Sequence, residues 1–172
     1  LFASGLIGAG VRQNLQDAEH VQVSTSSVIS ISLRGEFSDL KSEVVNINSQ
    51  SFSQMVLEGE ATTYIPNQPV LPSVSRFVVV PPTSNLELVI SFSEPVRVPA
   101  DLPPLIFTPD SGLTISSFEQ GDIFPSVVAE MSPPIIIRGV RLVKVTIYPV
   151  RYDYRTNEFM RYKSIDTEVR AV

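Results

Sequence analysis

The chain has 172 residues, which suits a single domain long enough to bury a hydrophobic core. Its formal net charge is −5 and it lacks a cluster of Lys and Arg, which excludes nucleic acid and anionic membrane surfaces as principal partners. Because the chain has no cysteine, these residues cannot form a disulfide, a thiolate metal site or a cysteine nucleophile. A mean hydropathy of +0.16 is high for a soluble protein and predicts that some apolar surface faces a partner.

Residues 1–25 are expected to form a partly extended N-terminal lead, followed by the folded domain over residues 26–172. The apolar opening LFASGLIGAG is shorter than the ~18 residues of a membrane span and lacks the basic region that begins a signal peptide. Its glycines do not have the order of a phosphate-binding loop, and no strand precedes them. Residues 11–20 are the best helix candidate of the chain, and a short one.

From residue 28 onward the pattern is that of strands. Short runs rich in Val, Ile, Ser, Thr and Phe alternate apolar with polar residues and are separated by turn residues, without helical periodicity. This pattern predicts an all-β fold, an antiparallel β-sandwich or a set of curved sheets with proline-rich loops and at most one short helix. The clearest alternation lies within residues 28–37, 43–48, 74–80, 85–92 and 140–150.

Prolines indicate where strands end. Pro72 and Pro81 are expected to mark the two ends of one strand, because proline cannot donate to a β-ladder. The segment of residues 93–110 carries five prolines in eighteen residues, which predicts a largely exposed, stiff and extended loop. A stiff segment loses little conformational entropy when it docks, so this loop is the first candidate for a functional surface.

Residues that could support catalysis or bind a metal are few and scattered. The only histidine, His20, lies in a polar segment, and we expect it to be a solvated surface residue. The acidic residues do not have the spacing of a calcium loop. Nothing in the sequence places two carboxylates within the ~5 to 10 Å that glycoside hydrolysis needs, the candidates being Glu119, Asp122 and Glu130. We therefore assign no catalytic residue, no metal site and no cofactor.

The aromatic residues keep a second class of function open. Tyr148, Tyr152 and Tyr154 cluster around Pro149, and such a group could bind sugar or could be buried at strand positions. The alternative function is thus an adhesion or carbohydrate-binding β-sandwich module of a surface protein.

Two stretches, taken together, resemble the N-terminal propeptide of gingipain-type cysteine peptidases. They are GEATTYIPNQPVLPSVSRFVVVPP, residues 59–82, and IIIRGVRLVKVTIYPVRYDYRTNEFMRYKSIDTEVRAV, residues 135–172. The resemblance extends over roughly residues 40–172. Its motifs are a Leu-Pro strand entry, a proline after that strand, an Arg-Gly-x-Arg strand and a Pro-x-x-Tyr corner, here Leu71, Pro72, Pro81, Arg138, Gly139, Arg141, Pro149 and Tyr152. One departure is Asp153 and Tyr154, which stand where the family usually has Asn-Pro.

The second stretch also makes physical sense from its residues. Gly139 is expected to relieve crowding or to seat a bulge at a strand entry, and Pro149 to close a strand and turn it into a corner. Thr156 and Asn157 are expected to form a reverse turn before Phe159 resumes extended structure.

The resemblance implies a secreted or cell-surface zymogen segment that crosses the periplasm in transit. In that family an all-β prodomain packs on a caspase-like catalytic domain, helps it fold, keeps it latent and is removed by cleavage. The resemblance also implies that a catalytic domain follows Val172 and that this segment is not itself an enzyme.

In that family a basic side chain of the prodomain enters the specificity pocket of the peptidase. We predict that Arg97 is this side chain, because Pro95 and Pro99 stiffen the segment on both sides of it. Arg138 and Lys144 are less suited, since both lie in strong strand patterns. Arg170, near the end of the chain, is a candidate processing site, or the end of the last strand.

Overall fold

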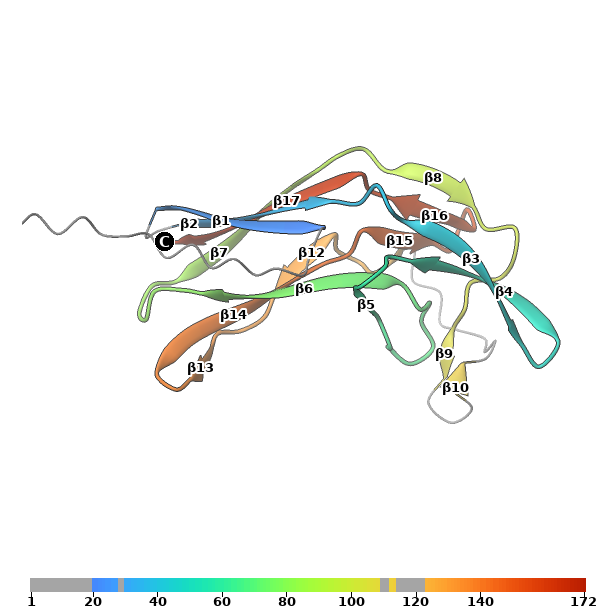
Figure 1. Cartoon of the computed structure of the whole chain (residues 1–172), viewed down its shortest axis with the longest axis horizontal. Helices are drawn as coiled ribbons and strands as arrows, with labels where there is room; N and C mark the ends of the chain where they lie inside the picture. The colour runs from blue at the N-terminus through green and yellow to red at the C-terminus, as the bar shows by residue number, and fades with distance from the viewer. Residues whose placement is uncertain (1–19, 28–29, 109–111, 114–122) are drawn as a thin grey trace, which may run out of the picture.

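The computed structural model describes residues 20–27, 30–108, 112–113 and 123–172. This part of the chain consists of strands and connecting segments without a helix, and its sheets are antiparallel (Figure 1). The predicted all-β class is therefore confirmed. No helix in the described part is long and apolar enough to cross a membrane. The predicted helix at residues 11–20 lies, apart from His20, outside the described residues.

The first sheet has four strands with the last strand of the chain at its centre. Its order is β1 (Val21–Ser27), β2 (Ser30–Glu36), β17 (Ser164–Ala171), β7 (Leu86–Phe92). β17 pairs with β2 on one side and with β7 on the other. Its side chains alternate between the interior and the outer face of the sheet, with Ile165, Thr167 and Val169 buried.

The second sheet is built on the pairing of two long strands from the two stretches that carry the family resemblance. Its order is β12 (Ala129–Met131), β14 (Val140–Ile147), β6 (Pro72–Val79), β5 (Ala61–Thr62), and β13 (Ile135–Ile137) also pairs with β14. β6 begins at Pro72 and ends two residues before Pro81, as the prolines predict.

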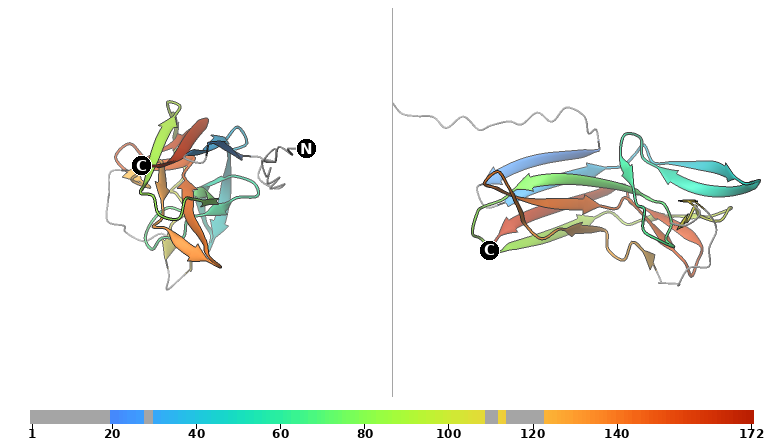
Figure 2. Two further views of the ribbon diagram at one scale, coloured as in Figure 1. Left: turned by 90° about the vertical axis from the view of Figure 1, so that its left-hand side faces the viewer. Right: turned by 90° about the horizontal axis from the view of Figure 1, so that it is seen from below.

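A third sheet and two hairpins complete the fold. The sheet has the order β11 (Ile123–Phe124), β15 (Val150–Asp153), β16 (Glu158–Arg161), β8 (Val96–Pro99). The hairpins are β3 (Lys41–Ile47) with β4 (Gln50–Val56), and β9 (Phe107–Thr108) with β10 (Gly112–Leu113). The β3–β4 hairpin extends beyond the sandwich at the end of the molecule opposite to the C-terminus (Figures 1 and 2).

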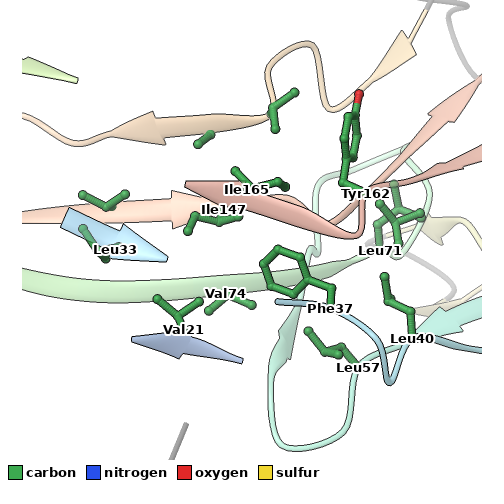
Figure 3. Packing of buried hydrophobic residues seen from close by; sticks show 14 of the residues in the cluster. Val21, Leu33, Phe37, Leu40, Leu57, Leu71, Val74, Ile147, Tyr162 and Ile165 are labelled. Atoms are coloured by element: carbon green, nitrogen blue, oxygen red, sulfur yellow. The ribbon is translucent and has the colours of Figure 1, made fainter. Parts of the chain in front are cut away.

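The main core lies between the first and second sheets. Leu33 and Ile165 contribute from one sheet, and Val74 and Ile147 from the other (Figure 3). Val169 of the first sheet belongs to the same cluster. A smaller cluster consists of Phe52 of the β3–β4 hairpin with Val70 and Leu105. Burial of these alternating apolar side chains drives the two layers together.

The β13–β14 hairpin turns on two residues, Arg138 and Gly139, because Ile137 pairs directly with Val140. Both have positive φ, 50° and 80°, which is the backbone of a type I′ turn and explains the glycine. Gly139 thus directly precedes β14, but the expected crowding or bulge there is wrong, since the pairing is regular and no atom beyond its chain neighbours lies within 4 Å of a Cβ built on Gly139. Arg138 lies in the turn and not in the expected strand.

The corner and the last hairpin agree with the sequence. β14 ends at Ile147 and β15 begins at Val150, so Pro149 lies at the corner between them. The turn between β15 and β16 covers residues 154–157, and Asn157 adopts a positive φ of 57° within it.

Two expectations need correction. Residues 93–108 are not a largely exposed loop: β8 is an edge strand, where proline is tolerated, and the side chains of Leu105 and Ile106 are buried at 1% exposure. His20 is buried rather than solvated, and its carbonyl accepts the N–H of Glu36 at the edge of the first sheet.

Candidate functional site

The candidate site is the proline-rich segment of residues 93–108 with the β15–β16 hairpin that supports it. β8 carries Arg97 along one edge of the third sheet, where Arg97 pairs with Met160 of β16. Beyond β8 the chain passes around the end of the molecule to β9 on its other side (Figure 1).

Arg97 is held by two carboxylates of the neighbouring hairpin. Its Nη1 lies 3.1 Å from Asp153 Oδ2 and 3.0 Å from Glu158 Oε2. The Arg97 side chain is 44% exposed, whereas that of Asp153 is 5% exposed. The guanidinium thus ties the edge strand β8 to the β15–β16 hairpin and stays accessible from solvent.

The electrostatics of this cluster favour the charged forms of all three side chains. Burial alone raises the pKa of Asp153, but hydrogen bonds from Arg97 and from the backbone N–H groups of Arg155 and Thr156 outweigh it and hold this pKa below its ordinary value. The pKa of Glu158 is also lowered, first by the hydroxyl of Thr156 and then by Arg97. The two carboxylates in turn raise the pKa of Arg97.

Pro95 and Pro99 lie on either side of Arg97, as expected: Pro95 precedes β8 and Pro99 is its last residue. To enter a pocket of another protein, the Arg97 side chain would have to leave Asp153 and Glu158. The inhibitory role of Arg97 therefore stays a prediction, and it requires that these two ion pairs break.

A small apolar hollow of about 270 Å³ follows β8 in the same segment. Its lining residues include Leu102, Pro103, Pro104 and Tyr152. The segment is anchored there by backbone and side-chain hydrogen bonds of Asn157: its carbonyl accepts the N–H of Ala100, and its Nδ2 donates to the carbonyl of Ala100 at 3.2 Å. The Tyr152 hydroxyl donates to Asn157 Oδ1. The corner tyrosine and the turn asparagine therefore fix the position of the proline-rich segment.

Neither Asp153 nor Glu158 was predicted to be a site residue. They pair directly across the β15–β16 hairpin, so the turn at residues 154–157 is the signal that could have placed them side by side. Asp153, which departs from the family pattern described above, accepts a hydrogen bond from Arg97.

Arg170 lies in the central strand of the first sheet, paired with Ser30 on one side and Glu87 on the other. Its guanidinium lies 2.6 Å from Glu168 Oε2. A peptidase would have to detach the end of β17 before cleaving after Arg170, because proteases bind extended, unpaired backbone. Its role as a processing site stays a prediction.

Two family motifs meet through Arg141. Its Nη1 donates to the carbonyls of Pro81 and Ser84 at 2.6 and 2.8 Å. The second arginine of the Arg-Gly-x-Arg motif thus anchors the turn that follows the proline at the end of β6, and so links the two stretches in space.

The described part of the chain offers little for chemistry of its own. No group of three metal-ligating side chains occurs within it, and Glu119 and Asp122 lie outside the described residues. Tyr148 and Tyr152 are buried at 8% and 2% exposure, so they do not form an open stacking platform for sugar. Tyr152 instead packs edge-on against Tyr154 and tilted against Phe159.

Comparison with known proteins yields a family and two solved structures. The family model Propeptide_C25 matches residues 12–171. No curated protein matches the sequence. The complex of Porphyromonas gingivalis RgpB pro- and mature domains is similar with a TM-score of 0.75 and 19% identity, over 90% of this chain and 86% of that one. A structure concerning the zymogenic latency of gingipain K from Porphyromonas gingivalis is similar with a TM-score of 0.70 and 19% identity, over 91% and 95%.

The family match covers nearly the whole chain, and the two structures share its fold. The chain belongs to the Propeptide_C25 family, the propeptides of gingipain-type cysteine peptidases, so it is the non-catalytic propeptide of a peptidase rather than an enzyme itself.

Proposed function

We propose that this chain docks on the catalytic domain of its own gingipain-type cysteine peptidase, holds it latent, assists its folding and is then removed by proteolysis. The observation that carries the proposal is the family match over residues 12–171. The relatives add support, because one was solved as a complex of pro- and mature domains and the other concerns zymogenic latency. A secreted or cell-surface location follows from the same reasoning.

The inhibitory contact that we propose is made by the proline-stiffened segment, with Arg97 as the basic side chain that enters the specificity pocket. Pro95 and Pro99 restrict the backbone on both sides, which lowers the entropy lost on docking. Proteolytic removal after Arg170 is proposed as the processing step. It would be detected by the mass of the released propeptide, which should end at Arg170.

Inhibition of the peptidase by purified variants tests the role of Arg97. Arg97→Ala should weaken inhibition while the complex still forms, and Arg97→Lys should restore part of it for a peptidase that accepts lysine. Arg97→Ala also removes the contacts to Asp153 and Glu158, so the unfolding midpoint must be measured for each variant. Asp153→Asn is the matched control, because it loosens the same contact and keeps the arginine. Full inhibition by Arg97→Ala would show that Arg97 is not the side chain that enters the pocket, while the proposed propeptide function would still hold.

A further inference from the structure

The outer face of the second sheet carries an apolar surface that the proposed function has not used. Val79 of β6 pairs with Leu142 of β14, and Leu142 pairs on its other side with Ile135 of β13. Residues paired directly across antiparallel strands share a face, so these three side chains form one row. We call this surface the β6–β14–β13 face. Its adjoining rows add Phe77, Ile137 and Val140.

The side chains of this face are exposed to an extent that is unusual for their type. Phe77 is 60% exposed and Val79 is 54% exposed, while the next residue along the same strand, Val78, is buried at 3%. Ile135, Ile137 and Val140 are each more than 40% exposed. The alternation of β6 therefore gives it two apolar faces, of which only one is covered by the core. A strand with one solvated face normally presents polar residues there, and a contiguous apolar patch marks an interaction site.

The charges on this face differ in sign from the chain as a whole. Lys144, paired with Phe77, lies within the apolar rows, and Arg138 lies at the β13–β14 turn beside them. Neither forms an ion pair with another residue of the described part. Glu130 is paired with Thr146 at the far end of the face and accepts the Tyr148 hydroxyl at 2.6 Å. Two cations and one carboxylate give this face a charge of +1 on a chain of −5. Its partner should therefore be apolar with carboxylates at the margin.

We propose that the β6–β14–β13 face is the surface by which the chain docks on the catalytic domain of its peptidase, against an apolar area bordered by carboxylates. This inference rests on the proposed function, which supplies the partner. β13 and β9 project from the same long side of the molecule, whereas β8 lies on the opposite side (Figure 1). A partner docked on this face therefore meets the β9 end of the proline-rich segment rather than Arg97, so the variants below and those of Arg97 test two separate contacts.

Binding measured by calorimetry or interferometry tests this assignment, with the catalytic domain of the cognate peptidase, its active site blocked, as the probe. Val79→Asp places a carboxylate in the centre of the apolar rows and should weaken binding about tenfold or more. Lys144→Glu should weaken it and also reduce its dependence on salt, because a favourable charge contact is lost. Val44→Asp is the matched control: Val44 is a strand valine of similar exposure, 62%, on the β3–β4 hairpin.

Each outcome either supports the proposal or overturns it. Weaker binding by Val79→Asp and Lys144→Glu, with unchanged binding by Val44→Asp and unchanged unfolding midpoints, supports it. If Val79→Asp fails to fold, Lys144→Glu and Phe77→Ser carry the same test. Equal binding by folded variants overturns the docking surface while the propeptide function stands. If the wild-type chain does not bind, both the docking surface and the proposed propeptide function are refuted. If size-exclusion chromatography shows that the wild-type chain dimerises and Val79→Asp abolishes only the dimer, the occupant is a second copy and the proposal is wrong.

Discussion

Three buried threonines should respond differently to one substitution, because their hydroxyls have different numbers of hydrogen bonds. Thr167 lies in β17 at 2% exposure, and its Oγ1 has no hydrogen-bond partner among the described residues. Thr146 Oγ1 is 3.0 Å from Ser75 Oγ. Thr63 Oγ1 donates to the carbonyl of Pro69 and accepts the N–H of Leu71, both at 3.1 Å. Valine has nearly the same shape as threonine, so replacement isolates the hydroxyl.

The magnitudes follow from what each substitution removes. A buried hydroxyl without a partner costs about 1 to 3 kcal/mol, so Thr167→Val should stabilise the fold by about 1 kcal/mol. Thr146→Val loses one neutral hydrogen bond and should destabilise it by about 1 kcal/mol. Thr63→Val loses two hydrogen bonds and leaves the N–H of Leu71, a residue of 0% exposure, without a partner. This substitution should destabilise the fold by about 2 kcal/mol.

Urea unfolding measures this series, since the free energy of unfolding shifts while the m-value should stay constant. In thermal unfolding, 1 kcal/mol corresponds to roughly 2 to 4 °C for a chain of this size. The reasoning is refuted if Thr167→Val lowers the stability, or if the three variants do not rank in the order Thr167, Thr146, Thr63.

Further predictions concern a close contact, the acid response and a turn. Gly35→Ala should destabilise the fold by about 1 to 3 kcal/mol in urea, because a Cβ at Gly35 would lie 2.5 Å from the Phe37 ring; equal stability would contradict this packing. The pKa values of Asp153 and Glu158 are lowered in the fold from ordinary values of 3.8 and 4.5, so stability should be full above these values and fall as the pH drops through and below them. Asp153→Asn should flatten the pH dependence of unfolding, and an unchanged slope would count against the cluster. Arg141→Ala should speed amide hydrogen exchange in the turn after β6, and unchanged exchange there would refute its anchoring role.

The strands were predictable because their alternation is local. Prolines placed β6, and period-two patterns placed β7 and β14, since burial of one face of each strand imposes that period. The β13–β14 turn was not predicted because an Arg-Gly pair fits a bulged strand as well as a type I′ turn, and only the pairing of Ile137 with Val140 decides between them.

The candidate site was less predictable because its contacts are distant in sequence. Arg97 was identified from its flanking prolines, but its ion pair with Asp153 spans 56 residues and depends on the order of strands in the third sheet. The burial of Leu105 likewise depends on the β3–β4 hairpin, which supplies Phe52. The high mean hydropathy predicted that an apolar surface exists, but composition does not say where on the molecule apolar residues gather.

Titration of the mature cognate peptidase with the purified wild-type chain tests the central claim most directly. The account predicts a one-to-one complex and loss of peptidase activity as the chain approaches equimolar concentration. Full activity in the presence of an excess of folded chain, with no complex on size-exclusion chromatography, would contradict it.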